Sequence, residues 1–113
     1  MKESEIERDA RLHVEDDGHV LIKIVPVVQG WPDRCLLLNN GATAWVEFKK
    51  RKKKPEPIQL VRLAWLNNNG HIAVWVDSYA AFVSFYNWFR IQTSARLGID
   101  RKSCPVPLPT SHN

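Results

Sequence analysis

Residues 30–49 read GWPDRCLLLNNGATAWVEFK and decide the fold, because two β-prone stretches surround one turn signal. The stretches 34–38 and 43–49 flank Asn40-Gly41, a dipeptide that strongly predicts a tight hairpin. We therefore expect two paired antiparallel strands. Asp33 begins one arm of this hairpin, and Glu47 and Lys49 lie near the end of the other, so pairing should bring these residues together.

The second arm also predicts which side chains share a face. Side chains alternate along a strand, so Glu47 and Lys49 should point to one face and Phe48 to the other. Asp33 and Glu47 can supply the oxygen ligands that a hard divalent cation prefers, and Mg²⁺ keeps several waters beside a few protein ligands. Lys49 could then orient a water or stabilise negative charge on a phosphate.

On the N-terminal side of the hairpin, the sequence predicts one helix and one strand. Ser4 followed by Glu7 matches a capping box, and apolar residues at helical spacing predict a helix over 4–15. The stretch 19–28 is rich in β-branched residues and predicts a first strand, in which Pro26 marks a bend or an edge.

On the C-terminal side, the prolines at 55 and 57 suit a helix start, and Gly70 suits its end. A short apolar strand is predicted at 72–76, and an aromatic stripe predicts a helix over 79–90. The crossover between the strands should make them a parallel pair. We expect a domain at 1–90 and a loosely ordered C-terminal extension at 91–113.

Composition bounds the remaining possibilities. With 113 residues, one hydrophobic core is expected, and the net charge of +4 comes largely from the unbroken basic run at 49–54. No apolar stretch is long enough for a membrane span, and the charged start lacks a signal-peptide core, which predicts a cytoplasmic protein. The histidines and two cysteines lack zinc-ligand spacing.

Three fragments together resemble the VRR-NUC branch of the PD-(D/E)XK nucleases, in particular its stand-alone phage domains. They are Gly30-Trp31-Pro32-Asp33-Arg34, Val46-Glu47-Phe48-Lys49 and Gln59 in the next helix. Each fragment is common by chance, but their joint occurrence across an Asn-Gly hairpin is much rarer. The resemblance covers roughly residues 3–83.

The resemblance implies an α/β fold with a restriction-endonuclease-like core. Its mixed four-stranded sheet has an antiparallel meander plus one parallel strand, and three helices flank it. The implied activity is a Mg²⁺- or Mn²⁺-dependent endonuclease that cleaves DNA, including structured or branched DNA. We also expect a homodimer, no membrane association, no organic cofactor, and a location in the cytoplasm of a bacterial or phage-infected cell.

The resemblance also assigns roles to residues. Asp33, Glu47, Lys49 and Gln59 fall on catalytic positions, and Asp33 and Glu47 are expected to ligate the metal. Glu7 of the first helix falls near a third ligand position, with Glu3 one turn earlier as its competitor. The residues expected to contact DNA are Trp31, Arg34, Lys50, Arg51, Lys52, Lys53 and Lys54.

Simpler interpretations stay open. Glu7 has a sufficient role in a capping box, Gln59 could be an exposed residue of a helix start, and Asp33 could be an ordinary turn residue. The chain could also be a noncatalytic nucleic-acid-binding module that uses the basic run 49–54. Asn67-Asn68-Asn69-Gly70-His71 faintly resembles an HNH nuclease, but the spacing does not fit.

Overall fold

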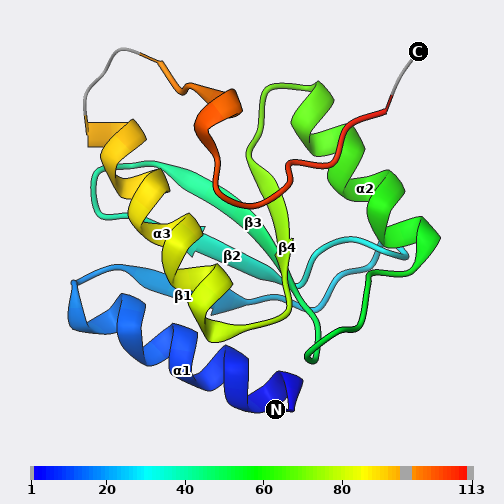
Figure 1. The fold of residues 1–113 in the computed structure, drawn as a ribbon, viewed down its shortest axis with the longest axis horizontal. Coiled ribbons are helices and arrows are strands. Elements are labelled where there is room, and N and C mark those ends of the chain that lie inside the picture. The colour runs from blue at the N-terminus through cyan, green and yellow to red at the C-terminus, as the bar shows by residue number, and fades with distance from the viewer. Residues whose placement is uncertain (1, 95–97, 112–113) are drawn as a thin grey trace.

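A computed structural model describes residues 2–94 and 98–111 of the chain. Its helices surround one sheet (Figure 1). In chain order the elements are α1 (Glu3–Asp16), β1 (Val20–Lys23), β2 (Arg34–Leu37), β3 (Thr43–Phe48), α2 (Pro57–Asn68), β4 (Ala73–Val76), α3 (Tyr79–Ser94) and the short 3₁₀ helix η1 (Arg101–Ser103).

The four strands form one mixed sheet in the order β1-β2-β3-β4. β1, β2 and β3 are antiparallel neighbours, and β4 runs parallel to β3. The turn between β2 and β3 is closed by the backbone bond from Leu38 N–H to Ala42 O, 2.9 Å, and Gly41 takes a positive φ of 94° there. The predicted hairpin and the parallel pair are therefore both confirmed, and the fold is the predicted α/β fold.

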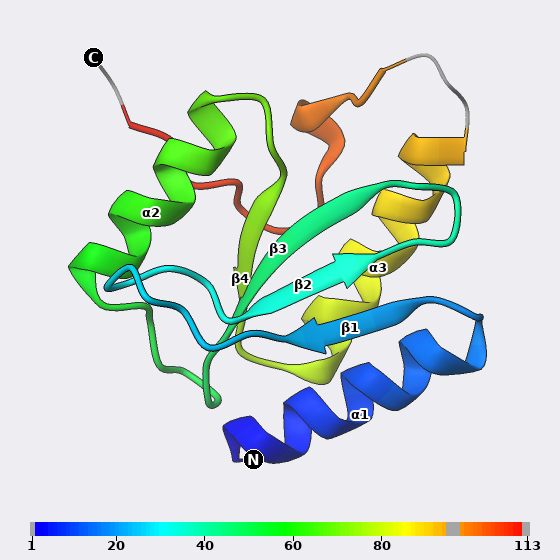
Figure 2. The ribbon, with the colours of Figure 1, turned by 180° about the vertical axis from the view of Figure 1, so that it is seen from behind.

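The helices form layers on both faces of this sheet (Figures 1 and 2). α1 and α3 cover one face, where Val46, Phe48 and Phe82 are completely buried in the main core. α2 covers the opposite face over β3 and β4, where Leu63 and Leu66 pack against Ala73. No helix within the described ranges 2–94 and 98–111 covers the part of that face formed by β1 and β2 (Figure 2).

Two predicted elements differ in length from the observed ones. β1 ends at Lys23, short of Pro26, whose nitrogen cannot donate to a ladder, and the chain bends at 27–28. α3 continues to Ser94, four residues past the domain boundary predicted at 90. Residues 95–97 and 112–113 of the predicted extension lie outside the described residues.

The described part of the extension lies against the domain. Cys104, Val106 and Leu108 pack against the main core. The buried Asn67 side chain donates to Ala73 O and to Pro109 O, at 2.7 and 2.8 Å, and so ties the extension to the end of α2. The loose order of this extension stays a prediction.

No helix among the described residues has the length and apolarity that a bilayer crossing needs.

Candidate active site

Asp33 and Glu47 lie on neighbouring strands at one end of the sheet. β2 and β3 pair Arg34 with Val46, so one step further along the register places Asp33 beside Glu47. Directly opposed residues in antiparallel strands have Cβ atoms about 4.5–5.5 Å apart. The backbone bond from Ile24 N–H to Asp33 O, 2.8 Å, continues the pairing of β1 and β2 to the same level. The hairpin thus holds both carboxylates at its open end.

Glu47 has two side-chain partners that reach it from different directions. Its Oε2 lies 3.5 Å from Lys49 Nζ and accepts a hydrogen bond of 3.1 Å from Gln59 Nε2. Glu47 is only 5% exposed and Lys49 only 8%. Phe48, between them in sequence, points into the main core. Alternation along β3 therefore separates a charged face from an apolar one.

Gln59 connects this charged face to the start of α2. Its Oε1 accepts a hydrogen bond of 2.8 Å from Glu56 N–H, which is the capping-box contact of the helix. The amide nitrogen of the same side chain is then free to donate to Glu47. The helix-start interpretation and the site interpretation of Gln59 both describe real contacts, because its two polar atoms serve different partners.

The acidic groups at this end raise one another's pKa. Burial and then the negative charge of Asp33 raise the pKa of Glu47 to about 7. Burial and then the charge of Glu7 raise the pKa of Asp33 above its ordinary value. The pKa of Glu3 is raised too, first by burial and next by Glu7. A region that disfavours its own negative charges is one that a cation would stabilise.

Glu7 lies at the same end of the sheet, in an ion pair with Arg34. The distance from Arg34 Nε to Glu7 Oε1 is 2.9 Å, and both side chains are nearly buried. The predicted capping box of Ser4 and Glu7 is wrong: α1 begins at Glu3 after the N-cap residue Lys2, which places Ser4 inside the helix. Glu7 points toward β2 instead, where its ion pair with Arg34 compensates two nearly buried charges.

The donor set suits a hard cation only in part. Asp33 and Glu47 offer carboxylate oxygens on one face, which matches the ligand preference of Mg²⁺ and Mn²⁺. Within residues 2–94 and 98–111, however, no three His, Cys, Asp or Glu side chains are grouped as a metal site. Glu7 is bound to Arg34, and Glu47 is bound to Lys49 and Gln59. Asp33 and Glu47 therefore fit as two ligands, and Glu7 would join them only after leaving Arg34.

The basic run lies beside the carboxylates and leaves its side chains in solvent. Residues 50–53 form a turn closed by Lys53 N–H and Lys50 O, 3.0 Å, and Lys52 has a positive φ of 67°. The charge of Lys53 lowers the pKa of Glu3, so this turn lies next to the start of α1. Figures 1 and 2 both show the N-terminus of α1 near the loop that leads to α2. The turn adds positive charge at the border of the acidic pocket.

The predicted DNA-contacting residues differ in how exposed they are. Arg34 is held inside by Glu7, whereas the side chains of 50–54 are exposed. Trp31 is half-buried and lies edge-on to Trp45, with ring centroids 5.8 Å apart. Trp65 on α2 is more exposed, at 52%, and also contacts Trp31. The exposure of Trp65 and its contact with Trp31 could not be predicted from the sequence, because both depend on how α2 packs against the sheet.

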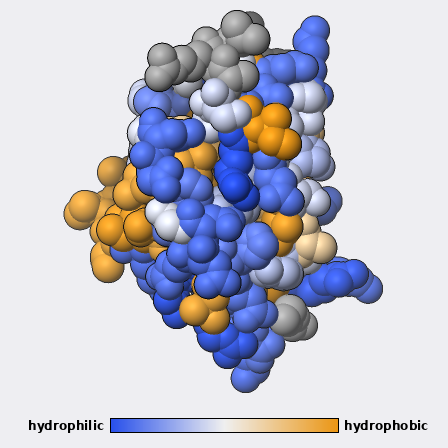
Figure 3. Space-filling view, turned by 90° about the vertical axis from the view of Figure 1, so that its left-hand side faces the viewer, coloured by the Kyte–Doolittle hydropathy of each residue, from blue (hydrophilic) through white to orange (hydrophobic). Residues whose placement is uncertain are grey.

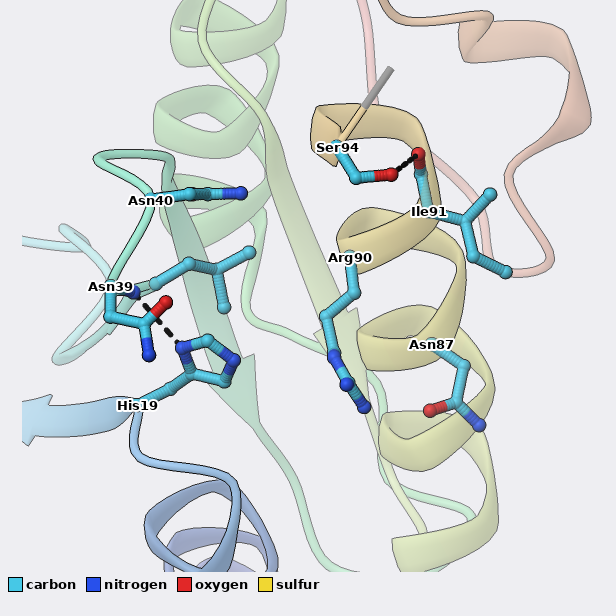
Figure 4. A pocket seen from close by; sticks show the side chains of 8 residues that line it. His19, Asn39, Asn40, Asn87, Arg90, Ile91 and Ser94 are labelled. Carbon is cyan, nitrogen blue, oxygen red and sulfur yellow. Dashed lines mark hydrogen bonds between the residues drawn. The ribbon is translucent and has the colours of Figure 1, made fainter.

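A cavity lies away from these residues, between the hairpin turn and α3 (Figure 4). Its volume is about 620 Å³, and its lining includes His19, Asn39, Asn87 and Arg90. His19 Nδ1 accepts from Asn39 N–H, and Arg90 is bound to Asp17, so these groups already have partners in the protein. None of the predicted catalytic residues lines this cavity, and the buried charges rather than the larger volume indicate the candidate site.

Comparison with known proteins gives two matches. No family model matches the chain. A protein named "Putative nuclease p44" from Acyrthosiphon pisum secondary endosymbiont phage 1 is 37% identical over 79 residues, which are 69% of this chain and 85% of the phage protein. A solved structure described as "VRR_NUC domain" matches with a TM-score of 0.71 and 25% identity, and the match covers 77% of this chain and 96% of that one.

Proposed function

The chain belongs to the VRR-NUC family of nucleases, and from that premise we propose a divalent-metal-dependent endonuclease that hydrolyses phosphodiester bonds in DNA, with structured or branched DNA as the preferred form. The observation that carries this proposal is the buried contact group around Glu47. Asp33 lies beside it across the hairpin, and Lys49 and Gln59 both touch its carboxylate.

In this proposal Asp33 and Glu47 would hold a Mg²⁺ or Mn²⁺ ion, which would supply positive charge toward phosphate oxygens and lower the pKa of a bound water. Lys49 places an ammonium beside the same pocket, where it stabilises the negative charge that develops on phosphate. Gln59 keeps the Glu47 carboxylate oriented, because its other end is fixed by Glu56. The roles of Lys49 and Gln59 use contacts with Glu47 that exist without DNA.

The third acidic position belongs to Glu7 in this proposal. Glu7 is more buried than Glu3, and its charge raises the pKa of Asp33. The Arg34 guanidinium pairs with the Glu7 carboxylate and neutralises its charge. Glu7 would bind a metal ion only after leaving Arg34. The exposed basic turn at 50–53 then contributes contacts to the phosphate backbone that depend on ionic strength.

The test uses labelled linear, branched and supercoiled DNA with Mg²⁺ or Mn²⁺. We expect cleavage by the wild type, and loss of cleavage with retained binding in Asp33→Asn, Glu47→Gln and Lys49→Ala. Asn87→Ala is the matched control, because Asn87 is exposed at the remote cavity. Equal cleavage by all four variants and the wild type would contradict the assignment of these residues.

A noncatalytic nucleic-acid-binding module is the second candidate. It is favoured by the ion pairs that occupy Glu7 and Glu47, since these leave no grouped metal ligands among the residues that the structure describes. The same assay separates the two candidates. Binding of DNA without cleavage under any metal condition would support the binding module.

We further propose that the protein acts as a homodimer through the side of the sheet that lacks a helix. Val20, Ile22 and Leu37 are half-exposed there, on and beside the edge strand β1. Figure 3 shows apolar side chains gathered along one border of a mostly hydrophilic face. Uncovered apolar strand faces commonly mark contacts between subunits. Sedimentation should show a wild-type dimer and an Ile22→Lys monomer, and a wild-type monomer at micromolar concentration would contradict the proposal.

A further inference from the structure

An apolar pocket lies in the loop that joins β1 to β2, and this loop leads into Asp33 of the candidate active site. Its volume is about 260 Å³, and it is lined by Ile24, Val25, Pro26, Val27, Val28 and Trp31. The loop leads into Asp33, which is two residues after Trp31 and is bonded through its carbonyl to Ile24 N–H. Any ligand in this pocket would therefore lie close to the proposed catalytic carboxylate.

The side chains around this pocket are unusually exposed. Val25 is 91% and Val27 100% exposed, although each is a large hydrophobic residue. Isolated exposed apolar residues need no explanation, but here they surround a concave site with an indole as one wall. A surface of this kind suits a flat apolar ring that enters from solvent.

The pocket is built on a rigid support rather than on a free loop. Gly30 has a positive φ of 81°, and a Cβ at this position would lie 2.8 Å from the Ile58 side chain and 3.0 Å from its backbone, so the loop packs tightly against α2. Arg62 Nε donates to Gln29 O at 3.0 Å, which adds a second attachment. The Trp31 ring is braced by Trp45 and Trp65. Trp31 is thus held in place before any ligand binds.

From these observations we infer that the pocket formed by 24–28 and Trp31 binds one unpaired nucleobase of the DNA substrate, next to the bond that is cleaved. This inference rests on the proposed nuclease function and names the feature of DNA that the site recognises. Pockets for drug-sized ligands measure roughly 300–1,000 Å³, so this smaller pocket suits a single ring system. An apolar wall and an aromatic face are the surfaces on which unpaired bases stack.

Charge supports a nucleotide rather than a second protein chain as the occupant. The basic turn at 50–53 follows Glu47 and Lys49 in sequence and lies near Glu3 at the start of α1, and the chain carries a net charge of +4. A DNA strand that places its phosphate between the turn and the carboxylates presents its neighbouring bases to the loop. A base in a regular duplex is stacked and paired, so only an unpaired base can enter.

The experiment measures binding without divalent metal, in EDTA, by fluorescence anisotropy. Two probes have the same sequence: a fully paired duplex, and the same duplex with one unpaired nucleotide. We expect tighter binding of the second probe by the wild type. Trp31→Leu should weaken binding of that probe about tenfold and leave duplex binding unchanged, because one base–aromatic stack is lost. Trp31→Phe retains a ring and should restore most of the preference.

Two further variants keep the test independent of folding. Ile91→Ser changes an exposed apolar side chain at the remote cavity, away from Trp31, and should keep the preference. Val25→Ser combined with Val27→Ser changes only exposed side chains and should reduce the preference about threefold. Equal affinity of the wild type for both probes would overturn the inference. A double variant that becomes monomeric while keeping the full preference would also overturn it, and would identify the loop as a contact between copies.

Cleavage in Mg²⁺ is measured separately on both probes. Preference for the unpaired probe without any cleavage would contradict the nuclease proposal and leave the base pocket supported. Cleavage of both probes without a binding preference would support the nuclease proposal and contradict the base pocket.

Discussion

The two ends of the sheet are both polar, but they differ in where the charge lies. At the open end of the hairpin, Glu7, Glu47 and Lys49 are buried, and burial together with the charge of Asp33 raises the pKa of Glu47. At the turn end, Asn39, Asn87 and Arg90 border a cavity but remain near solvent. Burying a charge is unfavourable unless function or a strong partner compensates for it. On this ground we propose the reactive site at the open end, where charge is buried, rather than at the larger cavity.

The sharpest way to break this comparison is to remove one carboxylate at the open end. We expect Asp33→Asn to lower the cleavage rate by roughly 10²–10³-fold, the effect of losing one group that acts on developing charge. Asn87→Ala at the turn end should leave the rate unchanged. Initial rates on a labelled branched duplex in Mg²⁺ provide the measurement, and comparable losses in the two variants would refute the distinction between the ends.

The second test concerns stability at the open end. Arg34→Met should leave the Glu7 carboxylate buried without its partner and lower the free energy of unfolding by about 3 kcal/mol. Glu7→Gln in the same chain should recover most of this loss, because the uncompensated charge is gone. Urea denaturation at pH 8 measures both. An unchanged free energy of unfolding in Arg34→Met would contradict a buried ion pair between Arg34 and Glu7.

A third test uses pH on the metal-free protein. Burial and Asp33 raise the pKa of Glu47 to about 7 in the folded state, from an ordinary value of 4.5. The folded state therefore holds the Glu47 proton more tightly than the unfolded state does. The contribution of this proton to the free energy of unfolding is fully present below pH 4.5 and is lost as the pH rises to about 7. The loss should be on the order of 3 kcal/mol. Denaturation in EDTA from pH 4.5 to 8 measures it, and Glu47→Gln should flatten the profile.

A fourth, smaller effect is expected at Gln59. Gln59→Ala removes its bond to Glu47 and its capping contact with Glu56. Loss of an orienting partner should lower metal affinity and cleavage by roughly 10–100-fold, and the lost hydrogen bonds should lower stability by about 1 kcal/mol. Titration with Mn²⁺ separates the affinity change from the rate change. A Gln59→Ala protein with normal metal affinity would remove Gln59 from the site.

The smallest expected effect is at the basic turn. Lys53→Ser should weaken DNA binding evenly across sequences and reduce the slope of log affinity against log salt by about 0.9, because one phosphate contact is lost. Lys102→Ser, at η1, is the matched exposed control. Anisotropy between 50 and 200 mM salt makes the measurement. Equal slopes in wild type and Lys53→Ser would exclude a contact at this lysine.

Much of the fold could be predicted because local chemistry decides it. Asn40-Gly41 predicts a turn wherever it lies between β-prone stretches, and the alternation at 47–49 predicts opposite faces for Glu47 and Phe48. The capping box predicted for Ser4 failed, because Glu7 has a stronger partner in Arg34, 27 positions away. The predicted first strand was too long, because β-branched residues at 25–28 favour an extended backbone whether or not a neighbouring strand is available.

The sequence by itself determined the hairpin and the residues at its open end, since both depend on neighbours within a few positions. The parallel pair of β3 and β4 joins residues far apart in sequence, and it followed from the order of the elements and the handedness of the crossover. Only the tertiary structure decided which charges are buried together. It joined Glu7 to Arg34, brought Gln59 of α2 to Glu47 of β3, and closed the loop at Gly30 against Ile58. These contacts link residues from separate elements, and their energies depend on desolvation, a property of the packed molecule that no local pattern of residues contains.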